Sequence, residues 1–494
     1  MSHVVVIGAG VGGLATAARL SVKGHNVTIL EQSNRVGGKL HTHHRSGYAF
    51  DTGPSLFTLP AVYRDLFLKT GKSLEDSVDL QPVDPAFRYH FADSTELLLP
   101  GVDPAKCANA IAESMGKQAG EEWREFMRRA GEMWRLTRQP FLQSPLNGFA
   151  SLLPLANPRD VATIAPFTTL RKLATKTFTD PRLVTLVDRY ATYTGSDPRK
   201  APAVLATVPY IEQLFGAWHI GGGLGTLAQA LEKRCGERGV DIRLNTSVSE
   251  ILTDGNRVTA VLTEAGETIS ADIVVSNVDA RLTYGELLSQ SPAKKPKVPG
   301  DPSLAGFVIL LGLKGKTPGI AHHNVWFPIN YDAEFDAIFG RNPQPVSDPT
   351  IYVCSPDDPL MRPNADSESW FILVNAPRHE PTGRNGVNWD AAGLADSYSK
   401  RILEILAQRG TDIRDRIDLM EVNTPADLER STRAPGGSIY GTSSNGVNAA
   451  FNRPANKSPI EGLFLVGGSA HPGGGLPLVG MGAEITADLI GRAP

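Results

Sequence analysis

The chain has 494 residues, enough to bury a large core and to form two or more domains. A net charge of −3 argues against nucleic acid as a partner, and three cysteines far apart in sequence argue against a disulfide framework or a thiol redox centre. No apolar run reaches the ~18 residues of a spanning helix, and the first strand begins too early to leave room for a signal peptide. We therefore expect a cytoplasmic protein whose membrane contact, if any, is peripheral.

The first residues of the chain predict a strand, a glycine-rich turn and a helix. Residues 4–7 are apolar and typical of a buried parallel strand, and residues 14–20 have the apolar spacing of a helix. Between them, Gly8, Gly10 and Gly13 have the G-x-G-x-x-G spacing. The first glycine makes a tight turn, the second lets the backbone approach a pyrophosphate, and the third lets helix and strand pack closely. The helix N-terminus adds N–H groups and a positive dipole end.

A second strand and an acidic residue complete this pattern. Residues 27–30 are apolar, and Glu31 follows them 18 positions after Gly13. A carboxylate at this distance can accept hydrogen bonds from ribose hydroxyls. Strand, glycines, helix, second strand and acid together predict a dinucleotide site.

Two further segments indicate which dinucleotide binds. Residues 35–39, Arg-Val-Gly-Gly-Lys, resemble the continuation of the FAD signature in glutathione-reductase-like flavoproteins. The resemblance is to the branch shared by amine oxidases, protoporphyrinogen oxidase and the bacterial carotenoid (phytoene) desaturases, and it implies FAD. Residues 48–55 resemble the Phe-Asp-x-Gly-Pro segment that passes beside the flavin in carotenoid desaturases; the alternative is a simple Gly-Pro turn.

Three histidines at positions 41, 43 and 44 raise the question of a metal site. Imidazoles two residues apart lie on one face of a strand. No carboxylate or cysteine stands nearby to complete a ligand set, so polar residues on an edge strand are favoured and no metal is expected.

The middle of the chain predicts a second domain that covers the reactive face of the flavin. It begins with a helix near residue 61, strands within 79–99 and a charged helical stretch over 105–138, whose aromatic residues we expect in the core. Residues 140–185 alternate apolar clusters with an excess of basic residues. This pattern suits either an interfacial segment on a membrane surface or an amphipathic helical cap, and the sequence leaves both open.

A second glycine-rich loop, residues 218–225, precedes a predicted helix over 226–238. No apolar strand stands directly before it and no ribose acid follows, so we reject a nicotinamide site there. Residues 240–251 alternate as a strand, 257–270 form a hairpin, and 271–277 read as a buried strand.

The last part of the chain predicts a substrate-domain sheet and a return to the cofactor. Strands over 305–313, 350–354 and 369–375, with a helix over 389–409, favour a mostly antiparallel sheet beneath a long apolar tunnel. Residues 462–482 then give an apolar strand, a glycine turn and a helix start. This stretch resembles the His-Pro-Gly-x-Gly-x-Pro motif of bacterial carotenoid desaturases, including hydroxycarotenoid 3,4-desaturases. A helix N-terminus there would suit the flavin N1/O2 edge.

The predicted fold is α/β: a Rossmann-like FAD-binding domain of the glutathione-reductase/amine-oxidase type with an α+β substrate domain and a helical membrane-facing region. We expect residues 1–75, 218–288 and 455–494 in the FAD-binding domain and 76–217 and 289–454 in the substrate domain. The expected cofactor-binding residues are Gly8, Gly10, Val11, Gly12, Gly13, Glu31, Gln32, Gly38, Lys39, Gly53, Pro54, Ser55, Val248, Asn277, Gly467, Gly468, Pro477, Val479, Gly480 and Met481.

The resemblance implies a desaturase that oxidises CH2–CH2 to CH=CH in a long isoprenoid, phytoene-like or a hydroxylated acyclic carotenoid. Hydride would leave an allylic carbon for flavin N5, the polyene would delocalise the cation, and water or a weak base would take the proton. Such chemistry asks mainly for positioning and exclusion of water, so no catalytic triad is expected. His471 and Asp51 are the candidates beside the ring. The electron acceptor, oxygen or quinone, stays open.

Two other classes of protein compete with this interpretation. An amine oxidase would place half of an aromatic sandwich in its C-terminal segment, but residues 466–494 contain no aromatic residue. A non-enzymatic lipid-escort protein, like the Rab escort proteins, shares the architecture. The intact glycine fingerprint with Glu31 favours a flavin-bearing enzyme.

Overall fold

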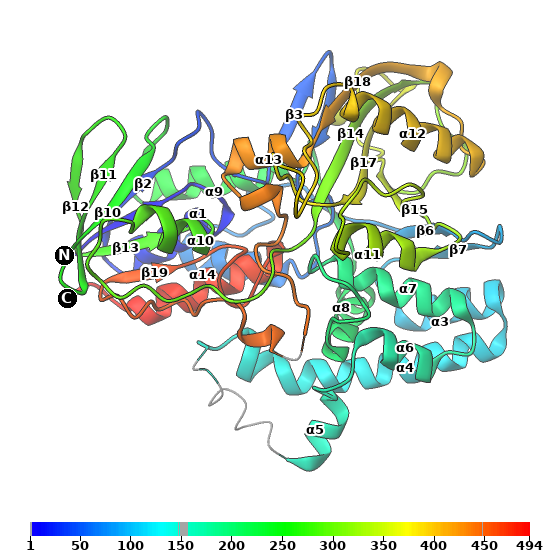
Figure 1. Cartoon of the computed structure of the whole chain (residues 1–494), viewed down its shortest axis with the longest axis horizontal. Coiled ribbons are helices and arrows are strands. Elements are labelled where there is room, and N and C mark those ends of the chain that lie inside the picture. Colours follow the sequence, from blue (N-terminus) through cyan, green and yellow to red (C-terminus); the bar gives the residue numbers. More distant parts are fainter. Residues whose placement is uncertain (1, 147, 149–156, 447) are drawn as a thin grey trace.

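In the computed structural model, which describes residues 2–146, 148, 157–446 and 448–494, a five-stranded parallel sheet holds the N-terminal motif. Its order is β19-β13-β1-β2-β9. The strands are β1 His3–Ile7, β2 Asn26–Leu30, β9 Asp241–Arg243, β13 Ile273–Ser276 and β19 Leu463–Leu465. Three distant parts of the chain therefore build one sheet, on the left of Figure 1.

Alternate residues of β1 serve the two faces of this sheet. Val4 and Val6 pack with helices on one face, and Val5 and Ile7 pack with a smaller sheet on the other. The helices are α1 Val11–Val22, α2 Ala61–Thr70, α9 Gly225–Glu237 and α14 Leu476–Ile490, and the smaller antiparallel sheet is β10 Val248–Asp254, β11 Arg257–Thr263 and β12 Thr268–Ser270. Burial on both faces explains why β1 reads as a continuous apolar run rather than an alternating one.

The single strand expected over 240–251 is wrong. The structure has two strands there, β9 in the parallel sheet and β10 in the antiparallel one. Asn245 lies between them with a φ of +52°, in the left-handed region that ends an extended strand. Its N–H donates to the carbonyl of Ser33, which fixes the chain reversal.

A seven-stranded sheet forms the second half of the molecule, in the order β18-β14-β17-β16-β15-β6-β7. Its strands are β6 Phe87–His90, β7 Glu96–Leu99, β14 Ala305–Lys314, β15 His323–Trp326, β16 Ile351–Cys354, β17 Ser367–Ala376 and β18 Ile417–Asn423. All neighbouring pairs are antiparallel except β6 with β15, so the expected mostly antiparallel sheet is confirmed. The sequence analysis missed β15 and β18.

Helices lie below this sheet in Figure 1 and pack on it through apolar faces. They are α3 Pro104–Met115, α4 Lys117–Thr137, α5 Pro158–Ile164, α6 Leu170–Thr177, α7 Pro181–Thr192 and α8 Thr207–Phe215. Trp123, Phe126, Met127 and Trp134 of α4 are buried, as expected for core residues. The remaining elements are β3 Thr42–Arg45, β4 Tyr48–Asp51, β5 Leu80–Pro82, β8 Trp218–Ile220, α10 Ala280–Leu282, α11 Tyr331–Phe339, α12 Leu394–Gln408 and α13 Pro425–Thr432.

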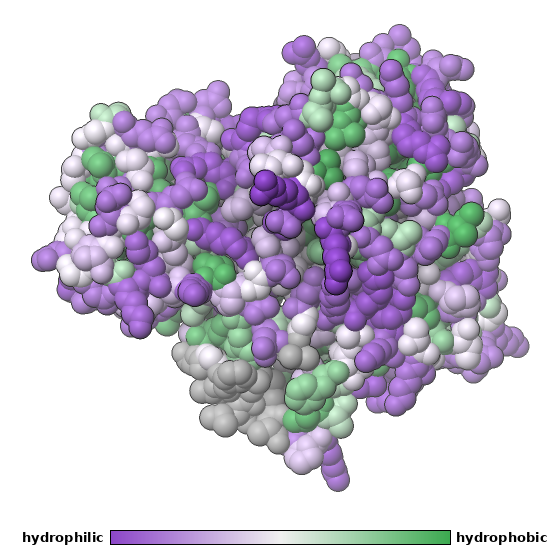
Figure 2. All heavy atoms as spheres, viewed as in Figure 1, coloured by the Kyte–Doolittle hydropathy of each residue, from purple (hydrophilic) through white to green (hydrophobic). Residues whose placement is uncertain are grey.

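The segment expected to face a membrane is only partly described. Its cluster around residues 149–156 lies outside the described residues, and within the described ranges the structure holds no helix that combines the length and apolarity of a bilayer span. Apolar side chains gather at the tip formed by α5 (Figure 2). Phe167, just beyond α5, is 82% exposed.

Arg171, one of the basic residues of this segment, has protein partners. Its guanidinium donates to Asp188 at 2.5 Å and to Asp332 at 2.6 Å. These bonds tie α6 to α7 and α11, so Arg171 joins elements of the protein and is not free to meet a membrane surface.

Candidate active site

One large cavity of about 970 Å³ opens at the carboxyl ends of the parallel strands. Ligands of open α/β sheets bind at this edge because the strand-to-helix turns expose backbone groups there. The expected cofactor-binding residues that line this cavity are Gly8, Gly10, Val11, Gly12, Glu31, Gln32, Gly38, Lys39, Gly53, Pro54, Ser55, Val248, Asn277, Gly467, Gly468, Pro477 and Val479. They come from six separate segments of the sequence, so the fold brings the predicted motifs to one place.

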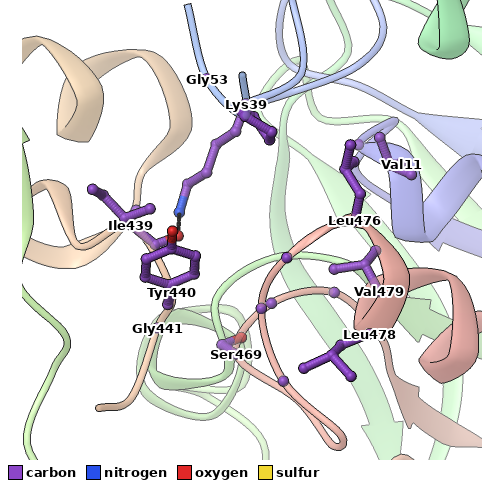
Figure 3. Close-up of a pocket in the computed structure, with 18 of the residues that line it drawn as sticks. Val11, Lys39, Gly53, Ile439, Tyr440, Gly441, Ser469, Leu476, Leu478 and Val479 are labelled. Carbon is purple, nitrogen blue, oxygen red and sulfur yellow. Dashed lines mark hydrogen bonds between the residues drawn. The ribbon is translucent and has the colours of Figure 1, made fainter. Parts of the chain in front are cut away.

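Two helix N-termini point their unpaired ends at the cavity. The cap residues of α1 and α14 are Gly10 and Gly475, and neither helix has a side-chain cap or an acidic residue in its first turn. Both starts line the cavity (Figure 3). Free N–H groups and the positive dipole end make each a fitting partner for an anionic or electron-rich group.

The third glycine-rich helix start, at α9, is filled by the protein itself. Asp51 Oδ2 accepts from Leu224 N at 3.0 Å, and Thr42 Oγ1 accepts from Gly225 N at 3.0 Å. A Cβ on Gly223 would lie 2.5 Å from Thr42 Oγ1, so no space remains for a ligand. This packing agrees with the rejection of a nicotinamide site at residues 218–225.

Glu31 is held in place by the loop that it faces. Its Oε2 accepts from the N–H of Ala9 at 2.7 Å, and its Oε1 accepts from the N–H and hydroxyl of Ser33 at 2.9 and 2.8 Å. The side chain is 93% buried yet lines the cavity. The carboxylate therefore fixes the glycine loop and keeps its remaining acceptor capacity for a ligand.

Asn277 explains why glycines surround it. A Cβ on Gly10, Gly12 or Gly467 would come within 2.7 Å of its side-chain amide. The amide Nδ2 donates to the carbonyl of Gly8 at 3.3 Å. Asn277, directly after β13, thus lies between the N-terminal loop and the loop after β19. The backbones of these two loops can approach Asn277 this closely only because the residues there are glycines.

Lys39 crosses the cavity toward a different part of the chain. Its Nζ donates to the carbonyls of Ser438 and Ile439, both at 2.9 Å, next to the ring of Tyr440 (Figure 3). Burial lowers the pKa of this amine to about 8, against the opposing attraction of Asp279. The ammonium ion is thus held by carbonyl dipoles in a site where an anion would stabilise it further.

Asp51 and His471 do not line the cavity. Asp51 accepts from Thr42 Oγ1 at 2.7 Å and from the start of α9, and burial raises its pKa. His471 Nε2 donates to the carbonyl of Ser144 at 3.0 Å, and burial lowers the pKa of the imidazole to about 4. Both side chains are engaged in holding the surrounding backbone, so the geometry supports positioning rather than contact with the reacting atoms.

Three of the expected cofactor-binding residues also lie behind the cavity wall. A Cβ on Gly13 would lie 2.2 Å from the carbonyl of Gly8, which is the close strand–helix packing expected of the third glycine. Gly480 packs against Val62, and Met481 is buried beside Trp134. These residues shape the wall without lining it.

The two histidines of β3 differ in their surroundings. His43 lines the cavity with its Nε2 2.8 Å from Glu421, and His44 is exposed. The structure brings together another group that the sequence did not indicate: the ligand atoms of His322, His323 and Cys354 lie within 4.8 Å of one another. His323 already hydrogen-bonds through Nδ1 to Tyr352, and burial lowers the pKa of His322 to about 3, so these imidazoles are neutral.

Beyond the glycine loops, the same cavity continues along an apolar wall. This part is lined by Leu56, Leu59, Phe141, Leu142, Ile164, Pro166, Val204, Leu205, Val208, Ile211, Leu304, Val308, Phe371 and Leu373. These residues come from the segment before α2, from helices and connecting turns within residues 141–211, and from β14 and β17 of the seven-stranded sheet or the residue before β14. The wall also contains polar residues that sequence reasoning missed, namely Arg189, Tyr193, Glu212 and Tyr352.

Comparison with known proteins defines the class. The family model described as "Flavin containing amine oxidoreductase" matches residues 11–316. The 4,4'-diapolycopene oxygenase of Methylomonas sp is 34% identical over 99% of this chain and 98% of its own. The 1-hydroxycarotenoid 3,4-desaturase of Flavobacterium sp. (strain P99-3) is 34% identical over 99% of each chain. The 4,4'-diaponeurosporene oxygenase of Staphylococcus aureus is 31% identical over 99% of this chain and 98% of its own.

Solved structures agree on the fold. An oxidoreductase from Methanosarcina mazei superposes with a TM-score of 0.63 at 17% identity, over 98% of this chain and 100% of its own. Putrescine oxidase bound to putrescine gives 0.64 at 14% identity, over 99% of both chains.

The chain belongs to the flavin containing amine oxidoreductase family. It is an FAD-dependent oxidoreductase, which confirms the enzyme class and the cofactor expected from the motifs. Within this family, its relatives at 31–34% identity are of the carotenoid desaturase type, as the resemblance implied.

Proposed function

We propose that the protein is an FAD-dependent carotenoid desaturase that acts on a long acyclic isoprenoid. The observation that carries this proposal is the continuity of one cavity: the glycine loops and helix starts form one part, and a long apolar wall forms the other. A hydrocarbon chain lying along that wall would reach the cofactor without crossing water. The names of the full-length relatives supply the substrate class.

We propose that the cavity-lining members of the predicted set hold the cofactor. Glu31 would accept from ribose hydroxyls, the start of α1 would face the pyrophosphate, and the start of α14 would face the ring system. When bound, FAD accepts the hydride that desaturation releases. The protein positions the chain, excludes water and offers fixed dipoles, and the cation that develops is spread over the polyene.

The proposed domain division follows the sheets. Residues 1–75, 218–288 and 455–494 supply all five strands of the parallel sheet, which supports their assignment to an FAD-binding domain. Residues 76–217 and 289–454 supply the seven-stranded sheet and the helices beneath it, which supports a substrate domain.

We propose that substrate enters from a membrane surface near α5. Ile164 and Pro166 line the cavity, whereas the neighbouring Val161 and Phe167 are 38% and 82% exposed. Exposed apolar side chains beside a cavity that must take up an insoluble chain suit insertion below lipid headgroups. Lys172 is exposed close by and could meet anionic headgroups.

The test is expression in a carotenoid-producing host followed by extraction of its pigments. A product with two hydrogens fewer and a longer chromophore supports desaturation. A matched Gly13→Val variant, which blocks the strand–helix contact, should leave the host's pigments unchanged. A product with an added oxygen atom would instead indicate the activity named for the Methylomonas and Staphylococcus relatives, and unchanged pigments with wild-type protein would contradict the proposal.

A further inference from the structure

A buried guanidinium, that of Arg189, opens on the apolar part of the cavity. Arg189 lies on α7 and is 94% buried. Its Nη1 donates to the hydroxyl of Tyr193 at 2.7 Å. Within the described residues, the structure gives no acceptor for its Nε and Nη2, although the residue lines the cavity. A charged, buried donor set with open positions is costly unless something accepts from it.

The aromatic side chains around Arg189 stabilise its charge without accepting hydrogen bonds from Nε and Nη2. Aromatic rings enclose the guanidinium, with its carbon 5.0 Å from the centre of Tyr193, 5.3 Å from Phe87 and 5.7 Å from Tyr352. Cation–π attraction stabilises the charge, but ring faces do not accept hydrogen bonds from its edge as an oxygen does.

The carboxyl group of Glu212 lies near this charge, separated from it by the hydroxyl of Tyr193. The hydroxyl of Tyr193, which accepts from Arg189, donates in turn to Oε2 of Glu212 at 3.0 Å. Tyr190 donates to the other oxygen of Glu212 at 2.6 Å. Both oxygens of Glu212 are thus engaged by tyrosine hydroxyls, and burial raises the pKa of this carboxyl group against the opposing charge of Arg189. A neutral oxygen acceptor suits this site better than a second carboxylate, which would add an unbalanced buried charge.

The cluster also lies close to the segment proposed to pass beside the cofactor. The hydroxyl of Tyr352, whose ring Arg189 faces, hydrogen-bonds with the hydroxyl of Ser55 at 2.9 Å. Only one side chain therefore separates the guanidinium from the Gly53–Ser55 segment. An oxygen held by Arg189 would belong to the end of the substrate that reacts, not to its distant end.

We propose that Arg189 binds an uncharged oxygen, a hydroxyl or a carbonyl, on the reacting end of the isoprenoid substrate. This inference rests on the proposed function and deepens it: the preferred substrate is an oxygenated acyclic carotenoid, and the bond oxidised lies within a few carbons of that oxygen. Tyr193 and Glu212 are positioning residues that hold the guanidinium in place.

The test compares three acyclic carotenoids of equal length in phosphatidylcholine vesicles, one with a terminal hydroxyl, one with a terminal aldehyde and one a hydrocarbon. The wild-type holoenzyme should show a kcat/KM at least about 10-fold higher for an oxygenated substrate than for the hydrocarbon, as expected for a hydrogen bond from a charged donor. The favoured arm identifies the oxygen as alcohol or carbonyl. Arg189→Met, with unchanged FAD content, should bring this ratio close to one, and Arg189→Lys should restore part of it.

If Arg189→Met alone does not fold, the double variant Arg189→Met/Glu212→Gln replaces it in the same comparison, because it removes the carboxyl group together with the guanidinium. An equal loss on all three substrates, or a ratio unchanged by Arg189→Met, would overturn the inference. If wild-type protein turns over none of them, the proposed function fails. Carotenoid binding, measured by quenching of protein fluorescence, then still decides the role of Arg189: weaker binding of only the oxygenated compounds in Arg189→Met supports it, and equal binding refutes it.

Discussion

Glu31 is the side chain whose removal should most directly separate cofactor binding from folding. Its carboxylate accepts from the Ala9 N–H, the Ser33 N–H and the Ser33 hydroxyl, and it also faces the proposed ribose site. Glu31→Ala should leave the buried N–H of Ala9 without an acceptor, which costs about 1–3 kcal/mol of stability. Loss of hydrogen bonds to a charged acceptor should weaken FAD binding by a further ~1.5–3 kcal/mol, or roughly 10- to 150-fold in Kd.

The effects of Glu31→Gln on stability and on FAD affinity should lie between those of the wild-type protein and Glu31→Ala. The amide oxygen can still accept from Ala9, but its NH2 group then faces the N–H of Ser33, so part of the loop is left unpaired. Urea unfolding of the FAD-free protein measures the first effect, and FAD titration followed by flavin fluorescence measures the second. Glu264→Ala, at an exposed turn, is the matched control. Wild-type FAD affinity in Glu31→Ala would remove Glu31 from the cofactor site, whatever its effect on stability.

Three further predictions follow from the geometry. Gly13→Ala places a Cβ 2.2 Å from the carbonyl of Gly8 and should destabilise the protein by about 1–3 kcal/mol or more in urea unfolding. The control Gly236→Ala, in open space on α9, should stabilise the protein by roughly 0.5–1 kcal/mol. Equal effects of the two substitutions would refute the packing argument. FAD affinity should be highest below pH 8 and fall above it, because burial lowers the pKa of Lys39 to about 8 and a bound anion favours its charged form; a titration equally pH-dependent in Lys39→Met would contradict this. Phe167→Asp should reduce sedimentation with anionic vesicles while the equally exposed control Ile329→Asp does not, and unchanged sedimentation of the Phe167 variant would place the membrane contact elsewhere.

The N-terminal half of the site could be predicted from the sequence because its signals are local. The β1 strand, the glycines and Glu31 lie within one strand–helix–strand unit, and each residue type has a backbone reason to be there. The seven-stranded sheet was only partly predictable. β15 has four residues and β18 is half-buried along its length, so neither shows the pattern of a core strand.

Arg189 gave no signal at all in the sequence. It stands in an apolar stretch of α7 where a charged residue reads as one exposed position of an amphipathic helix. Its partners are sequence-distant: Glu212 lies on the next long helix and Tyr352 on β16. Only the tertiary structure shows that this charge is buried and aimed at a cavity. The same holds for Asp51, whose motif suggested the flavin but whose carboxylate caps α9.

Reduction of the protein's own flavin tests most directly whether this flavoenzyme oxidises a long isoprenoid. Purified holoenzyme would be mixed, without oxygen, with vesicles that carry an acyclic carotenoid, and the visible spectrum would be followed. We expect the yellow flavin absorbance to fall in step with the appearance of a carotenoid with a longer chromophore, one product for each flavin reduced. Flavin that stays oxidised with the carotenoid but is reduced by putrescine or another primary amine would contradict the account.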